Sequence, residues 1–551
     1  MEQKKKSATG SSEKDKKMLL SGVLILTVAN ILVKICGFFY KVPMNSMLGD
    51  DMYIVNAAYS IYNILYMIST AGIPVAVSVM VSECRARGDV RRLHRVFRVS
   101  LSALLVVGAS GMLLMLLFAH PIASYNSEGG KAFLSLCAIA PALLFISVCS
   151  VYRGYFQGFQ EMRPTAVSEI IESFVKMALG IALVYFYLNW VGKNGVVTAA
   201  LSVLAVTVGI VLGMLYLIFT HRRYKKKNRL VLFGDAVANE EETDNSSVLR
   251  RLISIAVPIS LSAVMLNLGA LVDSQVMFKM LEGYYGNAAM AEAVTSDYIG
   301  GAVTLYNMPS ILIYPIACSI VPFISAALES GDRLNAGRVT NSALRITALI
   351  SLPCALGMSA LSGPILNLIF GSGDAAMAAN AGDLLRILSI SIFLVAMLSL
   401  TNALLQANHK EKKPMISMGV GLAVKILSDL LLTHFFGPVG APISTVLMHI
   451  TVVSMNFYFV IRYTDVVPAF GSVFVRPFLA ALCSALAALG SYMLALTFLS
   501  PNLSVLCAIA VAAIVYLLAI FLFRCVTEED LGFIPKGKRI AQILHSFKLI
   551  R

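Results

Sequence analysis

Apolar stretches long enough to cross a lipid bilayer recur from one end of the chain to the other. A transmembrane helix needs roughly 20 such residues to cover about 30 Å of hydrocarbon. With 58% hydrophobic and 13% charged side chains, the 551 residues also carry too few charges for a water-soluble protein of this size. The sequence therefore predicts an all-α, polytopic membrane protein.

Hydropathy predicts about 14 transmembrane helices in three groups. Six spans are expected at 18–40, 53–81, 99–119, 133–156, 167–188 and 196–219; six more at 252–280, 298–328, 340–361, 384–406, 415–436 and 441–461; and two at 473–499 and 503–523. The predicted domains are a basic tail at 1–17, a six-helix lobe at 18–220, a linker at 221–248, a second six-helix lobe at 249–462, two extra helices within 463–524 and an amphipathic tail at 525–551. The first apolar run is too long for a signal peptide, so no cleavage is expected.

Basic residues fall on alternate loops, which predicts the orientation of the chain. The lysine-rich start and the basic end lie on the same side, so both termini are expected in the cytoplasm. One basic cluster is dense: Arg85, Arg87, Arg91, Arg92, Arg95 and Arg98. Its place in a short loop between spans favours contact with anionic lipid headgroups over nucleic acid. Membrane lipid is therefore an expected partner, and nucleic acid is not.

The two sets of six spans share a pattern. Lys176 lies 12 residues after Pro164 around the fifth span, and Lys425 lies 11 residues after Pro414 around the eleventh, so the spacing nearly matches. A duplicated half in the same orientation is the parallel-repeat plan of transporters, in which a central site lies between halves that rock against each other. The pattern predicts two six-helix lobes related by this repeat.

Ionisable residues deep in a span are costly and usually face a cavity. Lys34 lies well inside the first span, and Lys41 lies at its predicted outer edge. We expect Lys34 to line a cavity, although it can also reach outward to the headgroups. Lys41 fits an interfacial anchor as well as a cavity.

The fifth and eleventh spans carry charges that share a helix face. Glu169, Glu172 and Lys176 follow at i, i+3 and i+7, and Lys425 and Asp429 at i, i+4. One interpretation is a set of buried ion pairs that hold helices together. The other is a substrate-binding cavity flanked by two symmetry-related lysines. Asp273 in the seventh span is a weaker candidate for the same site.

Other charged and metal-binding residue types carry less weight. Arg153 is expected at the membrane interface, with a gate as the alternative, and Arg345 is expected to reach out of the membrane. No phosphate-cradling loop and no metal-ligand spacing of histidine or cysteine occurs in the sequence. We expect no enzymatic activity and no cofactor or metal, and the sequence leaves a coupling cation undetermined.

Short motifs occur in a characteristic order along the chain: KICGFFYKVP at 34–43, AGIP at 71–74, VSE at 81–83, YRGYFQG at 152–158 and RPTAVS at 163–168. Through them the sequence resembles the polysaccharide branch of the multidrug/oligosaccharidyl-lipid/polysaccharide exporter superfamily, and more narrowly the group of stage V sporulation protein B and the lipid II flippases. The resemblance covers nearly the whole chain.

The resemblance implies a two-lobed fold with a cationic central cavity that opens alternately inward and outward. It also implies that the two helices at 473–523 form a groove for a polyprenyl tail. The function expected is a flippase for an undecaprenyl-diphosphate-linked cell-wall precursor or polysaccharide unit at the bacterial plasma membrane. Lysines would neutralise the diphosphate, because moving this anionic group into hydrocarbon without nearby cations has a large free-energy cost. The alternatives are a cation-coupled multidrug antiporter and a scaffold for cell-wall synthesis enzymes.

Overall fold

The structure is a computed structural model that describes residues 25–26, 28–37, 39–41, 43–44, 47–126, 130–227, 244–309, 333–370, 375–408, 410–464, 467–527 and 530. Within these ranges the regular structure is helical and no strand occurs, which confirms the all-α prediction. The chain divides into two compact units, residues 1–264 and 265–551. The division falls inside α10 (Asn245–Tyr285), beyond the predicted linker at 221–248.

Among the described residues, 11 helical segments are long and apolar enough to cross a membrane. One of them, Lys412–Thr464, has 53 residues, about 80 Å at 1.5 Å per residue and far more than one crossing needs. It is a hairpin of α18 (Lys412–Phe436) and α19 (Gly440–Thr464), joined by a short turn. The first and eighth predicted spans lie partly outside the described residues, so the total of fourteen stays a prediction.

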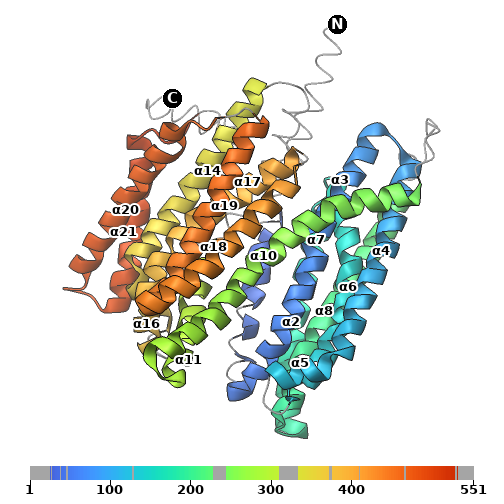
Figure 1. The fold of residues 1–551 in the computed structure, drawn as a ribbon, viewed down its shortest axis with the longest axis horizontal. Helices are drawn as coiled ribbons and strands as arrows, with labels where there is room; N and C mark the ends of the chain where they lie inside the picture. Colours follow the sequence, from blue (N-terminus) through green and yellow to red (C-terminus); the bar gives the residue numbers. More distant parts are fainter. Residues whose placement is uncertain are drawn as a thin grey trace. The chain divides into compact units, whose positions relative to one another are not determined.

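Unit 1 is built around α6 (Phe133–Gly158), which packs most extensively against three neighbouring helices (Figure 1). These are α3 (Gly72–Arg87), α4 (Val90–Leu117) and α8 (Gly195–Lys227). α7 (Arg163–Phe186) pairs with α8 along its length, and a π-helical turn at Tyr187–Val191 ends it. The short α5 (Ala119–Asn126) follows α4. This packing fixes α7, which carries the predicted charged face, against α8.

The second predicted span is broken at Ala71 into α2 (Met52–Thr70) and α3, which begins at Gly72. The backbone N–H of Gly72 donates to Ser260 Oγ at 3.1 Å. A Cβ at this position would lie 2.1 Å from the carbonyl oxygen of Ala256, so only glycine permits this approach to α10. Pro74 follows, and its missing N–H suits the start of a new helix.

Two glycines let α6 approach α3 closely. Gly154 and Gly158 are four residues apart and face α3. A Cβ at Gly154 would lie 2.6 Å from the carbonyl oxygen of Pro74, and one at Gly158 would lie 2.6 Å from Val81 Cβ. Small residues at this spacing let helix backbones meet, which is how membrane helices gain packing where lipid offers no hydrophobic drive.

Unit 2 contains the remaining long helices. α14 (Arg333–Ala360) packs against α17 (Ile390–Ala407) and α20 (Arg476–Ala495), and α20 pairs with α21 (Pro501–Leu522) (Figure 1). Shorter helices complete the unit: α11 (Ala288–Asp297), η4 (Tyr298–Val303), α12 (Thr304–Asn307), α15 (Ser362–Phe370), α16 (Ala375–Leu388) and η6 (Gly471–Val475). The last two predicted spans correspond to α20 and α21.

The interpretation of Arg345 as a residue that reaches out of the membrane is wrong. Arg345 on α14 is 6% exposed and makes a two-pronged ion pair with Asp530, with Nε 2.7 Å and Nη2 2.9 Å from the two carboxylate oxygens. Its Nη2 also donates to Thr527 Oγ1 at 2.9 Å. Arginine forms such paired hydrogen bonds with carboxylates because its donors have a fixed fork geometry. The ion pair therefore ties the segment after α21 to α14.

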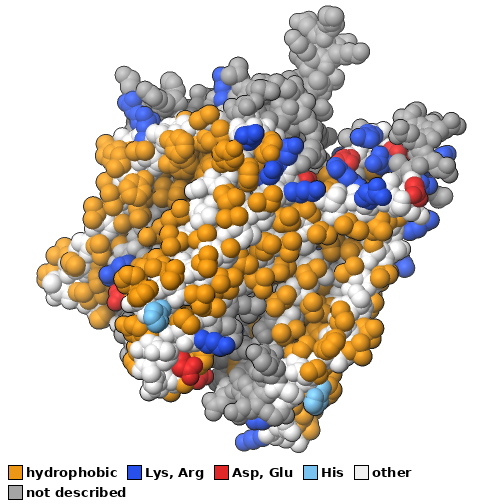
Figure 2. All heavy atoms as spheres, viewed as in Figure 1, with side chains coloured by type: hydrophobic (Ala, Val, Ile, Leu, Met, Phe, Trp, Pro, Cys, Tyr) orange, Lys and Arg blue, Asp and Glu red, His pale blue; other side chains and the backbone are white. Residues whose placement is uncertain are grey.

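Apolar side chains cover much of the helix surface, and lysines and arginines gather toward helix ends (Figure 2). On α4, Leu113 and Leu117 are 55% and 65% exposed, and Leu522 on α21 is 78% exposed. Many exposed leucines of this kind are unfavourable in water and favourable in lipid. The surface thus agrees with a protein whose helices face a bilayer.

Candidate functional site

The predicted charged face of unit 1 lies on α7 and receives an arginine from α6. Arg153 Nη2 donates to Glu172 Oε2 at 3.0 Å, and Nη1 lies 3.9 Å from Glu169 Oε1. Its Nε donates to Ser168 Oγ at 3.1 Å. Arg153 is only 6% exposed, so its guanidinium contacts these partners inside the protein rather than solvent, and its expected position at the membrane interface stays a prediction. Replacing either Arg153 or Glu172 by a neutral residue would leave the other as a buried charge without a partner, which is strongly destabilising.

Lys176 lies further along the same face, 13 residues past Arg163, or roughly 20 Å into α7. Its Nζ lies 4.8 Å from the ring centroid of Tyr40 and 5.0 Å from that of Tyr59. These aromatic faces attract a cation through the ring quadrupole. Within the described part of the chain, no carboxylate lies within ion-pair distance of Lys176, and Glu172, one turn away, is already paired with Arg153. A positive charge on this amine would therefore not be offset by direct contact with any described carboxylate.

The aromatic residues around Lys176 are themselves fixed. Tyr40 is 5% exposed, and its hydroxyl donates to the carbonyl oxygen of Ser202 on α8 at 3.2 Å. Gly180 on α7 gives the Tyr40 ring room, since a Cβ there would lie 2.8 Å from Tyr40 Cε2. Sequence reasoning named Lys176 but not the tyrosines, because an aromatic residue in an apolar span has no pattern that distinguishes a cation partner from a packing residue.

Lys34 and Lys41 lie on the described pieces of the first predicted span, where residues 28–37 and 39–41 are helical. Both side chains are exposed. Among the described residues, no hydrogen bond or ion pair joins either lysine to the other predicted site residues. Their role in binding a substrate therefore stays a prediction.

In unit 2 the predicted residues Asp273, Lys425 and Asp429 come together from two helices. Lys425 Nζ donates to Asp273 Oδ1 at 2.6 Å and lies 3.5 Å from Asp429 Oδ2. All three are buried, with 7%, 1% and 0% exposure respectively. The spacing argument for pairing between Lys425 and Asp429 agrees with this geometry, and Asp273 adds a second carboxylate from α10.

Two hydroxyls of α19 complete this group. Lys425 Nζ donates to Thr445 Oγ1 at 2.7 Å, and the Ser444 hydroxyl donates to Asp429 Oδ1. We call Asp273, Lys425, Asp429, Ser444 and Thr445 the Lys425 cluster. Sequence reasoning missed these two hydroxyls, because no local sequence pattern distinguishes Ser444 and Thr445 from the many other serines and threonines in the spans as hydrogen-bond partners of the charged residues.

The two lysines that match in the repeat pattern have different surroundings. Lys176 lies between aromatic rings, whereas Lys425 is enclosed and paired with two carboxylates. The Lys425 cluster holds two acids and one base, so in this structure its ammonium is not available to an anionic ligand. The described residues therefore support an anion-binding role for Lys176 more strongly than for Lys425.

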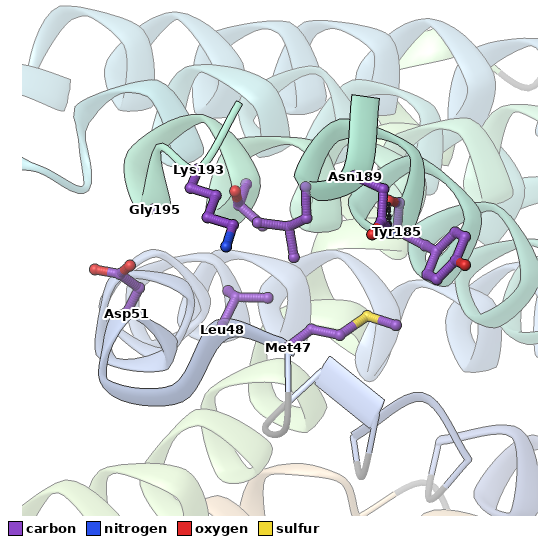
Figure 3. A pocket seen from close by; sticks show the side chains of 9 residues that line it. Met47, Leu48, Asp51, Tyr185, Asn189, Lys193 and Gly195 are labelled. Atoms are coloured by element: carbon purple, nitrogen blue, oxygen red, sulfur yellow. Dashed lines mark hydrogen bonds between the residues drawn. The ribbon is translucent and has the colours of Figure 1, made fainter. Parts of the chain in front are cut away.

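A separate pocket of about 490 Å³ lies in unit 1 at the end of α7 remote from Arg163. Asp51 and Leu48 form one side, and Tyr185, Asn189 and Lys193 form the other (Figure 3). None of the predicted site residues lines it. It is a mixed polar and apolar recess with one acid and one base.

Comparison with known families and proteins gives several matches. The model of the polysaccharide biosynthesis protein family matches residues 19–328, and the MatE model matches residues 275–431. The lipid II flippase MurJ of Bacillus subtilis is 25% identical, with 81% of this chain and 83% of that protein aligned. Stage V sporulation protein B of the same organism is 24% identical, with 94% and 98% aligned.

Solved structures of transporters share the fold. A MATE crystal structure in the straight conformation has a TM-score of 0.65 and 14% identity, and covers 82% of this chain and 96% of its own. A Pyrococcus furiosus transporter of the MOP superfamily, described as having a binding pocket of reversed polarity, has a TM-score of 0.64 and 14% identity. It covers 82% of this chain and 98% of its own. At these identities the likeness shows a MATE-like fold.

Proposed function

We propose that this chain, which belongs to the polysaccharide biosynthesis protein family, is a flippase for an undecaprenyl-diphosphate-linked cell-wall precursor or polysaccharide unit. The relatives named lipid II flippase and stage V sporulation protein B support this substrate class. Such a protein is a transporter rather than a catalyst. It moves the headgroup across the membrane by alternating access while the polyprenyl tail stays in lipid.

One observation carries the proposal: Lys176 lies deep in a membrane-spanning helix, and no carboxylate among the described residues lies within ion-pair distance of its amine. A diphosphate-linked headgroup is strongly anionic and costly to bring into hydrocarbon unless cations surround it. Lys176 offers such a cation. Its contacts with the rings of Tyr40 and Tyr59 are cation–π contacts, which position the ammonium group without pairing it with a negative charge. Lys34 and Lys41 are further cations that we propose meet the same headgroup.

The Lys425 cluster takes a different part in this proposal. Its ammonium already has two carboxylates and a hydroxyl as partners. We propose that it holds α10, α18 and α19 together within unit 2 rather than binding the diphosphate directly. This assigns recognition of the anionic substrate to unit 1.

The location of the protein, the role of its last two helices and its partners complete the proposal. We propose that the protein lies in the bacterial plasma membrane with both termini in the cytoplasm, as the alternation of basic loops favours. We propose that α20 and α21, which present exposed leucines, guide the polyprenyl tail. Cell-wall synthesis enzymes are proposed partners because they make or consume a substrate of this class.

The alternative, a cation-coupled multidrug antiporter, has one observation in its favour. The Lys425 cluster has one more carboxylate than ammonium, and an acidic excess suits a bound cation. The two functions separate in one experiment, because an antiporter exports an organic dye under an ion gradient and a flippase does not.

The test uses purified protein reconstituted in liposomes that contain an undecaprenyl-diphosphate-linked muropeptide with a fluorescent label. We expect the wild type to move label between leaflets, K176M to lose this activity and K176R to keep part of it. K226M, which changes an exposed lysine at the end of α8, is the matched control and should remain active. Full activity of folded K176M would overturn the proposed mechanism, and dye export without movement of the labelled lipid would favour the antiporter.

A further inference from the structure

A groove of about 900 Å³ lies in unit 1 between the N-terminal part of α4, from Val90 to Val106, and the start of α10. Its lining residues are Val90, Arg91, His94, Arg95, Arg98, Val99, Ser102, Ala103, Val106, Asn245 and Leu249. None of these residues belongs to the candidate site around Lys176. The volume falls in the usual range of small-molecule sites.

The lining changes from basic to apolar along one face of α4. Arg91, Arg95 and Arg98 follow at i, i+4 and i+7, and Ser102 and Val106 continue the same face. Val106 is eight residues beyond Arg98, or roughly 12 Å deeper along the helix. Arg91 and Arg98 are exposed, and Val106 is 69% exposed. The opposite face of α4 is buried in unit 1, so the groove face is the one left uncovered by described residues.

The second wall comes from the first turn of α10. Asn245 and Leu249 lie one turn apart, and Leu249 is 37% exposed. Asp244, just before α10, is the acidic neighbour: hydrogen bonds from Ser246 hold the pKa of this carboxyl below its usual range, so it stays ionised and partly offsets Arg95. The lining itself contains three arginines and neither aspartate nor glutamate.

We propose that this groove binds one anionic phospholipid, with the phosphate on Arg91, Arg95 and Arg98 and an acyl chain along Val99, Val106 and Leu249. A free phosphate would use the arginines but leave the apolar part of the groove empty. A diacyl lipid matches both parts and comes from the leaflet that this end of α4 meets. Two walls from different helices make the site specific, in contrast to the diffuse attraction of a basic loop to a charged surface.

The experiment measures lipid retention by native mass spectrometry of the full chain purified in detergent with added phosphatidylglycerol or phosphatidylcholine. We expect the wild type to retain one phosphatidylglycerol over phosphatidylcholine, and R91Q/R95Q/R98Q to lower that retention at least fivefold. R222Q/R223Q/K226Q removes the same number of charges from the exposed end of α8 and should retain the lipid.

A second variant tests the apolar part without changing charge. A103W fills the groove beside Ser102 and should lower retention to a similar extent, while the protein keeps its elution volume and melting temperature. An equal loss of phosphatidylglycerol retention in the α8 control would show that retention depends on general surface charge and not on this groove, and it would overturn the proposal. Unchanged retention in A103W, together with displacement of the lipid by inorganic phosphate, would assign the arginines to free phosphate and also overturn it. Neither outcome depends on flippase activity.

Discussion

At the scale of single residues, two lysines that share a position in the sequence pattern have opposite environments. Spacing within α7 and α18 predicts that each lysine lies on a face with an acid one turn away. It cannot predict that Arg153 pairs with the acid beside Lys176, or that Asp273 reaches Lys425 from α10. These partners come from helices distant in the chain, so they depend on how the helices pack.

Lys425 should matter for stability. K425M removes the only ammonium among the described members of the cluster and leaves two buried carboxylates without a cation, which costs about 3–5 kcal/mol. We expect a clear fall in the melting temperature of the purified protein in detergent, and partial recovery in K425M/D273N because one stranded charge is gone. A single variant as stable as wild type, or a double variant less stable than K425M, would contradict the role of the ion pairs.

The ring of Tyr59 should matter through its contact with Lys176. A desolvated cation–π contact contributes up to about 2 kcal/mol, equivalent to roughly thirtyfold in an equilibrium constant. We expect Y59L to lower transport at limiting substrate by about tenfold or more, and Y59F, which keeps the ring, to stay near wild type. Labelled-lipid movement in liposomes measures both. Equal loss in the two variants would point to the hydroxyl instead of the ring.

At the scale of helices, hydropathy predicts where the chain crosses the membrane but not where helices break. The described predicted spans coincide with long apolar helices, because burial in lipid depends only on the summed polarity of about 20 residues. The tenth span is divided at Ser389 into α16 and α17, and the second at Ala71, just before Gly72. Such breaks depend on contacts with other helices, as the approach of Gly72 to Ala256 shows.

The glycine pair on α6 gives a prediction for this scale. G158A places a Cβ 2.6 Å from Val81 Cβ, and overpacking of this kind costs about 1–3 kcal/mol. G490A on α20, where nothing lies within 4 Å, should be neutral or gain up to about 1 kcal/mol from helix propensity. The melting temperatures of the two purified variants test this prediction. Equal values would mean that α3 and α6 move apart to fit the added Cβ without loss of stability.

At the scale of the whole molecule, the distribution of charge predicts an orientation in the membrane but does not predict which charges pair with one another. Basic residues on alternate loops predict the side of each helix end, whereas the expectation that Arg345 reaches out of the membrane rested on its nearness to the end of a span. Its partner Asp530 lies beyond the last span, in the segment predicted to be a surface tail. A positional rule for lysines and arginines takes no account of acids supplied by distant segments, so it fails where such an acid folds back.

The orientation can be tested with the α7–α8 hairpin. α7 begins at Arg163, and α8 ends in the basic run from Arg222 to Lys226, so both ends should be cytoplasmic and the connection at Lys193 and Asn194 should face outward. We expect N194C to react with a membrane-impermeant maleimide in intact cells, and K226C to react only after permeabilisation. The unsubstituted chain measures background from native cysteines; the exposed ones among the described residues, Cys483 and Cys507, lie on the membrane helices α20 and α21. The reverse labelling pattern would place the groove lined by Arg91, Arg95 and Arg98 in the opposite leaflet. The groove would still be expected to bind an anionic phospholipid, because binding depends on its lining residues and not on the side of the membrane that they face.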